Sequence, residues 1–169
     1  SVGCDGMPLL QWLEPVVYPA ETWWSRAGAA PATRSAVARL ALEGTLGFAA
    51  YLSSDAEASG AALRTIASST GMPRVRAAAG RVVMDRAAPD ALTEEDRRRA
   101  SMRPSPSVAL PAPDGGRVEV SVNPRFAVAC SAELLAEVGW FVRDRAAAGA
   151  PVCVQTHLAE SAQECAEVA

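Results

Sequence analysis

Two stretches in the second half of the chain alternate between hydrophobic and polar residues. Every second residue from Val118 to Val122 is valine, and residues 152–157 repeat this period of two, which is typical of strands. Between them, apolar residues at helical spacing predict a helix that begins after Ser131 and ends at Gly149. A strand, a helix and a second strand in this order favour parallel pairing of the two strands.

The first half of the chain repeats this order of helices and strands. Mostly apolar strands between helices are typical of a sheet that helices cover on both faces. The predicted elements are a short helix over 9–14 that ends at Pro15, a helix over 31–43 that ends at Gly44, a strand over 45–52, a helix over 54–71 that begins with a Ser54/Glu57 capping box, and a strand over 75–84.

The segment from about 86 to 116 interrupts the pattern. A helix could begin at Thr93, but the arginines at 97–99 give it no apolar face, and four prolines between 104 and 113 prevent its extension. We therefore predict an irregular surface insertion, with the arginines solvated.

The polar faces of the two alternating strands bear on the fold class. Parallel strands usually bury both faces, so a polar face is unexpected in an open parallel sheet. In a closed barrel the valines would pack outward on helices and the polar residues would line the interior. The pattern therefore favours an α/β fold of the TIM (β/α)8 barrel type, with a half-exposed antiparallel sheet as the alternative.

Three polar residues lie near the predicted strand ends, where barrel enzymes keep their active sites. His157, the only histidine in the chain, could bind a metal ion, and Glu160 could transfer protons to or from a water molecule. Arg125 could hold a planar ligand that carries oxygen. The alternatives are a structural histidine and a salt bridge of Arg125 at the barrel end.

Composition narrows the possible partners. The chain has 169 residues, half of them hydrophobic, and a net charge of -3 without a basic face, so we expect no nucleic-acid partner. No apolar run is long enough to span a membrane and no signal peptide is visible, so we expect a cytoplasmic protein. The four cysteines form no CxxC pair and are expected to be inert thiols.

Four motifs in sequence order resemble those of guanine deaminase, a member of the amidohydrolase superfamily of metal-dependent barrel hydrolases. Together they span most of the chain, apart from the proline-rich segment. The motifs are LLQWLE with YPAE (residues 9–14 and 18–21), GRVVMD (80–85), NPRFA with CSAELL (123–127 and 130–135) and QTHLAE (155–160).

This resemblance implies hydrolysis of guanine to xanthine and ammonia, a step of purine catabolism, by a zinc-activated water molecule. His157 would bind the zinc ion and Glu160 would be the catalytic proton shuttle. Arg125 would contact the oxo group of the purine, and Phe126 would stack on its ring.

The resemblance also implies that the chain is incomplete. The family's His-x-His pair, a later histidine and a catalytic aspartate are absent. Residues 1–169 are therefore expected to form an incomplete barrel domain, roughly strands 2 to 5 with their helices, that binds zinc poorly and is inactive alone. Whether the full-length parent forms a homodimer is left open.

Two other functions remain open at this point. The first is an amidohydrolase that acts on another aminopurine, a pterin or a triazine. The second is a non-catalytic α/β remnant or interaction module, with unpaired sheet edges that would promote association.

Overall fold

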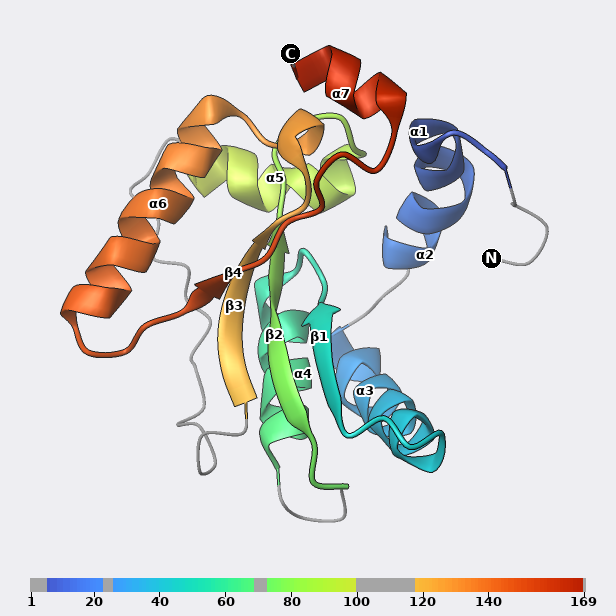
Figure 1. Cartoon of the computed structure of the whole chain (residues 1–169), viewed down its shortest axis with the longest axis vertical. Helices are drawn as coiled ribbons and strands as arrows, with labels where there is room; N and C mark the ends of the chain where they lie inside the picture. Colours follow the sequence, from blue (N-terminus) through green and yellow to red (C-terminus); the bar gives the residue numbers. More distant parts are fainter. Residues whose placement is uncertain (1–5, 23–25, 69–72, 100–117, 169) are drawn as a thin grey trace.

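The computed structural model describes residues 6–22, 26–68, 73–99 and 118–168, and it contains a parallel four-stranded sheet (Figure 1). The strands lie side by side in sequence order, and each neighbouring pair is parallel. This arrangement confirms the predicted α/β class and excludes the antiparallel alternative. The strands are β1 (Gly47–Tyr51), β2 (Arg76–Val83), β3 (Val118–Pro124) and β4 (Cys153–Val154).

Strand β4 is shorter than the predicted strand over 152–157. The chain nevertheless continues along β3, because the amide of Gln155 donates to the Val122 carbonyl oxygen at 3.3 Å. The amide of His157 in turn donates to the Arg125 carbonyl oxygen at 3.1 Å. Residues that follow β3 and β4 are therefore neighbours at the carboxyl edge of the sheet.

Helices α4 (Ala56–Ala67) and α6 (Ala132–Ala147) pack on one face of this sheet, hereafter the outer face. Val118 and Val120 belong to the cluster with α4, and Val122 packs with α6, as their alternation predicted. Helix α3 (Arg26–Leu42) contributes Val37 to the first cluster. Burial of these apolar side chains stabilises the layers.

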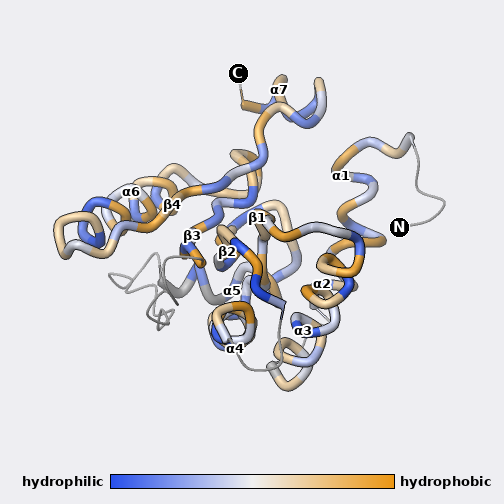
Figure 2. Tube along the Cα trace, turned by 60° about the horizontal axis from the view of Figure 1, so that its bottom comes forward, coloured by the Kyte–Doolittle hydropathy of each residue, from blue (hydrophilic) through white to orange (hydrophobic). Residues whose placement is uncertain are grey.

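Helix α6 begins and ends as the sequence predicted. The Ser131 hydroxyl caps it by accepting from the Leu134 amide at 3.1 Å, and Gly149 has a positive φ of 72° after its end. Asp85, after β2, accepts from the Ser131 amide at 2.7 Å and so ties this helix start to the sheet. Figure 2 shows hydrophilic and hydrophobic segments alternating along α6, as an amphipathic helix requires.

The predicted capping box of α4 is wrong by one residue. Asp55, and not Ser54, is the N-cap, and its carboxylate accepts from the Ala58 amide at 2.7 Å. Aspartate caps as well as serine.

The predicted stop at Pro15 is also wrong. Helix α1 (Leu9–Trp12) runs through a π-helical turn, η1 (Leu13–Val17), into α2 (Tyr18–Thr22). The Tyr18 amide bonds to the Leu13 carbonyl, five residues back. The wider turn lets the helical path continue past a residue that has no amide hydrogen.

The predicted irregular segment contains a helix, α5 (Asp90–Arg99), so the prediction is wrong over these residues. Its buried side chains are partly polar, so the sequence shows no continuous apolar stripe along this helix. Asp96 is 2% exposed and pairs with the guanidinium of Arg81 at 2.7 Å. Residues 100–116 of the predicted insertion lie outside the described residues.

The remaining short elements are η3 (Ala127–Ala129) and α7 (Ala162–Val168). The Ser161 hydroxyl accepts from the Glu164 amide at 3.1 Å and so caps the start of α7. Within the described ranges, no helix combines the length and hydrophobicity that crossing a membrane requires.

Candidate functional site

A polar network covers the face of the sheet opposite α4 and α6, hereafter the inner face. The side-chain amide of Gln155 donates to the Ser121 hydroxyl at 2.7 Å and to the Ala78 carbonyl oxygen at 3.3 Å. The side-chain amide of Asn123 donates to the carbonyl oxygens of Gly80 at 3.0 Å and Ala50 at 3.2 Å. These contacts link all four strands directly below the ends that carry the predicted site residues.

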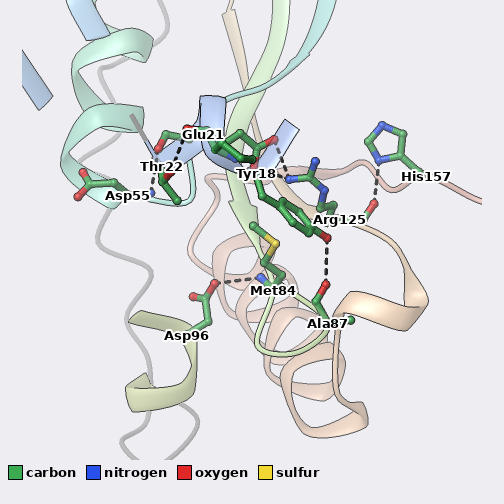
Figure 3. Close-up of polar contacts among 11 residues, drawn as sticks. Tyr18, Glu21, Thr22, Asp55, Met84, Ala87, Asp96, Arg125 and His157 are labelled. Carbon is green, nitrogen blue, oxygen red and sulfur yellow. Dashed lines mark hydrogen bonds and ion pairs between the residues drawn. The ribbon is translucent and has the colours of Figure 1, made fainter. Parts of the chain in front are cut away.

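Arg125, directly after β3, is buried and forms a salt bridge, the structural alternative that the sequence left open, with a partner that the sequence did not identify. Its Nη1 lies 2.8 Å and 2.6 Å from the two carboxylate oxygens of Glu21 in α2 (Figure 3). The guanidinium also lies 5.2 Å from the centre of the Tyr18 ring, within the range of a cation–π contact. Its Nε and Nη2 have no hydrogen bond to the described residues and remain available as donors.

Tyr18 fixes the position of α2 beside this guanidinium. Its hydroxyl donates to the Ala87 carbonyl oxygen at 3.0 Å (Figure 3). Burial raises the pKa of this hydroxyl, and the charge of Arg125 opposes that rise. The phenol therefore stays protonated at neutral pH and can keep donating this hydrogen bond.

The His157 imidazole is held by a residue at the end of the neighbouring strand, β3. Its Nδ1 lies 2.8 Å from the Arg125 carbonyl oxygen (Figure 3). A carbonyl oxygen only accepts, so Nδ1 must carry the hydrogen, and in the neutral ring Nε2 then carries the lone pair. This arrangement is typical of metal-binding histidines, whose second nitrogen donates to a carbonyl or carboxylate.

Tyr51, the last residue of β1, contacts the imidazole. The centres of the two rings lie 4.2 Å apart, with 36° between their planes. Burial raises the pKa of the Tyr51 hydroxyl, and the nearby charge of Glu160 raises it further. Tyr51 thus contacts His157 and lies within the electrostatic influence of Glu160.

Glu160 is exposed, in the loop that precedes α7. Its amide donates to the Glu164 carboxylate at 2.8 Å, and Ala159 before it has a positive φ of 55°. The Glu160 carboxylate has no hydrogen bond within the described part of the chain. It is therefore free to exchange protons with a bound molecule.

Phe126 follows Arg125 in the chain, and its side chain is buried in an apolar cluster that also includes Tyr18. It is 2% exposed and packs in a cluster at the carboxyl ends of the strands. The other buried members of this cluster are Leu13, Tyr18, Val82, Met84, Leu92 and Ala129. Its role in stacking on a purine stays a prediction.

The described residues fit a metal ion only in part. His157 offers one nitrogen in a suitable orientation, but no group of three or more histidines, cysteines and carboxylates is assembled within ranges 6–22, 26–68, 73–99 and 118–168. A zinc site needs three or four protein ligands. Within these ranges the metal site is therefore incomplete.

Comparison with known proteins agrees with the sequence motifs. The chain is 30% identical over 165 residues to a guanine deaminase of Dictyostelium discoideum, a match that covers 97% of the chain and 34% of that protein. The solved structure of Escherichia coli guanine deaminase superposes with a TM-score of 0.71 and 26% identity, over 96% of the chain and 36% of that protein. The resemblance to guanine deaminase is confirmed. No protein-family model matches the chain.

The chain therefore corresponds in sequence and fold to about a third of the length of each guanine deaminase that it matches. Within this third, the structure brings Arg125 and His157 together, with Glu160 close to Tyr51. The sequence pattern indicated no role for Glu21 or Tyr51. The position of Tyr51 at a strand end on the inner face could have identified it, whereas nothing in the sequence pairs Glu21 with a residue 104 positions away.

Proposed function

We propose that this chain is part of a zinc-dependent guanine deaminase, which hydrolyses guanine to xanthine and ammonia within a (β/α)8 barrel. The observation that carries the proposal is the orientation of the only histidine at the carboxyl edge of a parallel sheet. Similarity to two guanine deaminases over nearly the whole chain supports the choice of reaction.

In this proposal His157 contributes one zinc ligand through Nε2. A bound zinc ion would supply Lewis-acid activation of water near neutral pH. The hydrogen bond from Nδ1 to the Arg125 carbonyl oxygen holds the ring in this orientation. Glu160 would accept one proton from water and deliver it to a ring nitrogen, and it would then transfer the second proton of that water to the leaving amine.

Arg125 would bind the oxo group of guanine. Glu21 occupies Nη1 and holds the guanidinium in place, while Nε and Nη2 can donate to a planar ligand that carries oxygen. Adenine carries an amino group where guanine carries this oxygen. The arginine therefore favours guanine as the substrate.

The chain alone would be inactive, because His157 provides only one ligand. The active protein would include the residues encoded on either side of this chain, and they would complete both the barrel and the metal site.

Ammonia release by that full-length protein tests the proposal, with guanine, adenine, cytosine, an aminopterin and an aminotriazine as substrates. We expect turnover of guanine, little turnover of adenine or cytosine, and none by the 169-residue chain. Selective turnover of a pterin or a triazine would support the alternative amidohydrolase. Ammonia release by the 169-residue chain would contradict its proposed incompleteness.

A further inference from the structure

The contact between Tyr51 and His157 joins the end of β1, one edge strand of the described sheet, to the segment that follows β4, the other edge strand. Neighbouring strands lie about 4.8 Å apart, so β1 and β4 would be about 14 Å apart in a flat sheet. The rings nevertheless lie with their centres only 4.2 Å apart. Both side chains must therefore lean toward each other across the inner face.

A glycine leaves room for this approach. Gly80 is the register partner of Tyr51 in β2, so it occupies the adjacent position on the inner face. A Cβ atom at Gly80 would lie 1.6 Å from the Ser121 carbonyl oxygen. Only glycine fits this close approach of β2 and β3, so the position next to Tyr51 carries no side chain.

The imidazole is held at two places. Its Nδ1 bonds to the Arg125 carbonyl oxygen at 2.8 Å, and the Tyr51 ring packs against it. The hydrogen bond alone allows the ring to tilt, whereas an aromatic neighbour at this distance restricts the tilt. The Tyr51 hydroxyl has no hydrogen bond within the described part of the chain, so the contact depends on the ring.

We propose that Tyr51 is a positioning residue for His157, and that its ring holds the imidazole so that Nδ1 donates to Arg125 and Nε2 carries the lone pair. The importance of this orientation for metal binding rests on the proposed function. The orientation itself is a property of the chain and can be measured without metal or substrate.

The experiment uses the single histidine as its own reporter. With the 169-residue chain labelled with 15N, the imidazole nitrogen shifts at neutral pH report which nitrogen carries the hydrogen. We expect the Nδ1–H form in the unaltered chain and in Tyr51→Phe, which keeps the ring. In Tyr51→Ala and Tyr51→Leu we expect a shift toward the Nε2–H form that free imidazole side chains favour.

Tyr18→Phe is the control for the loss of a tyrosine hydroxyl. It removes the hydroxyl of the only other tyrosine and leaves the Tyr51 ring in place. Backbone amide spectra identify any variant that fails to fold, and the leucine variant preserves apolar bulk if alanine is not tolerated. An unchanged Nδ1–H form in folded Tyr51→Ala and Tyr51→Leu would overturn the proposal. A shift in Tyr51→Phe as large as that in Tyr51→Leu would overturn the role of the ring.

This result is separable from the proposed function. Failure of the full-length protein to release ammonia from guanine would refute the deaminase without altering the nitrogen shifts. Conversely, a deaminase with unchanged shifts in the Tyr51 variants would refute only the positioning role.

Discussion

Nδ1 of His157 lies 2.8 Å from the carbonyl oxygen of Arg125, so the backbone of one predicted substrate-binding residue orients the predicted metal ligand. The two residues follow neighbouring parallel strands, and their backbones are also bonded, from the His157 amide to the same oxygen at 3.1 Å. Any movement of the β3 end would therefore displace the imidazole and the guanidinium together.

Asn123 should be a major contributor to the stability of the inner face. Its buried side chain donates to the carbonyl oxygens of Ala50 and Gly80. Asn123→Ala would leave both acceptors without this donor and should lower the free energy of unfolding by about 2 kcal/mol. Urea denaturation measures the change, and Glu119→Ala, at an exposed position of the same strand, is the control. Equal effects of the two substitutions would argue against the network.

The buried pair of Arg81 and Asp96 should fix α5 to β2. Both side chains are at most 3% exposed, and the Asp96 carboxylate also accepts from the Met84 amide at 3.0 Å. Asp96→Ala should lower the free energy of unfolding by about 3–5 kcal/mol, because a buried guanidinium loses a carboxylate with which it pairs. Asp90→Ala breaks the exposed pair with Arg97 and should change it by less than about 1 kcal/mol. A small effect of Asp96→Ala in thermal or urea melts would contradict this assignment.

Gly80→Ala should disrupt the pairing of β2 and β3. The added Cβ would lie 1.6 Å from a backbone oxygen, which cannot move aside as a flexible side chain could. Gly139→Ala is the matched control: in α6 its Cβ would meet only the Arg143 side chain at 3.7 Å, and alanine should stabilise the helix by up to about 1 kcal/mol. Circular dichroism melts of the two variants should therefore shift in opposite directions. A wild-type melt for Gly80→Ala would contradict the close approach.

Cys130 should resist alkylation in the folded chain. Burial raises the pKa of its thiol to about 11, so little thiolate forms at pH 8. Exposed Cys165 should react with iodoacetamide first, as peptide mapping by mass spectrometry would show. The folded-state pKa lies above the ordinary value of 9.0, so above pH 9 the folded chain keeps this proton while the unfolded chain loses it. The free energy of unfolding should therefore fall as pH rises from 9 toward 11. Equal labelling of Cys130 and Cys165 at pH 8 would show that the thiol is not buried in solution.

Much of the fold could be predicted, because its signals are local. The valine alternation of residues 118–122, the Ser131 cap and Gly149 each depend on neighbours within a few positions. The error over residues 90–99 came from a helix without a local apolar signal. Helix α5 buries the charged Asp96, and its partner Arg81 lies in a strand 15 positions earlier in the chain.

The candidate site shows the same division. A strand-end position predicted that Arg125 and His157 would lie near each other, and they do. No local pattern predicted that Glu21 would pair with Arg125, or that the ring of Tyr51 would cross the inner face to His157. Such contacts depend on how helices and strands that are distant in the sequence are placed relative to one another. The hydrophobic periodicity of a single sequence does not specify that placement.

The most direct test of a deaminase that uses His157 is ammonia release from guanine by the proposed full-length protein with His157→Asn. Asparagine can still donate to the Arg125 carbonyl oxygen, so the fold should survive, whereas the proposed metal ligand is lost. We expect kcat/KM to fall by more than about 100-fold, since altering even the partners of metal ligands costs 10–100-fold. Leu158→Ala, at a neighbouring residue that is 80% exposed, should retain activity. Guanine turnover by folded His157→Asn at the rate of Leu158→Ala would contradict the proposed role of His157.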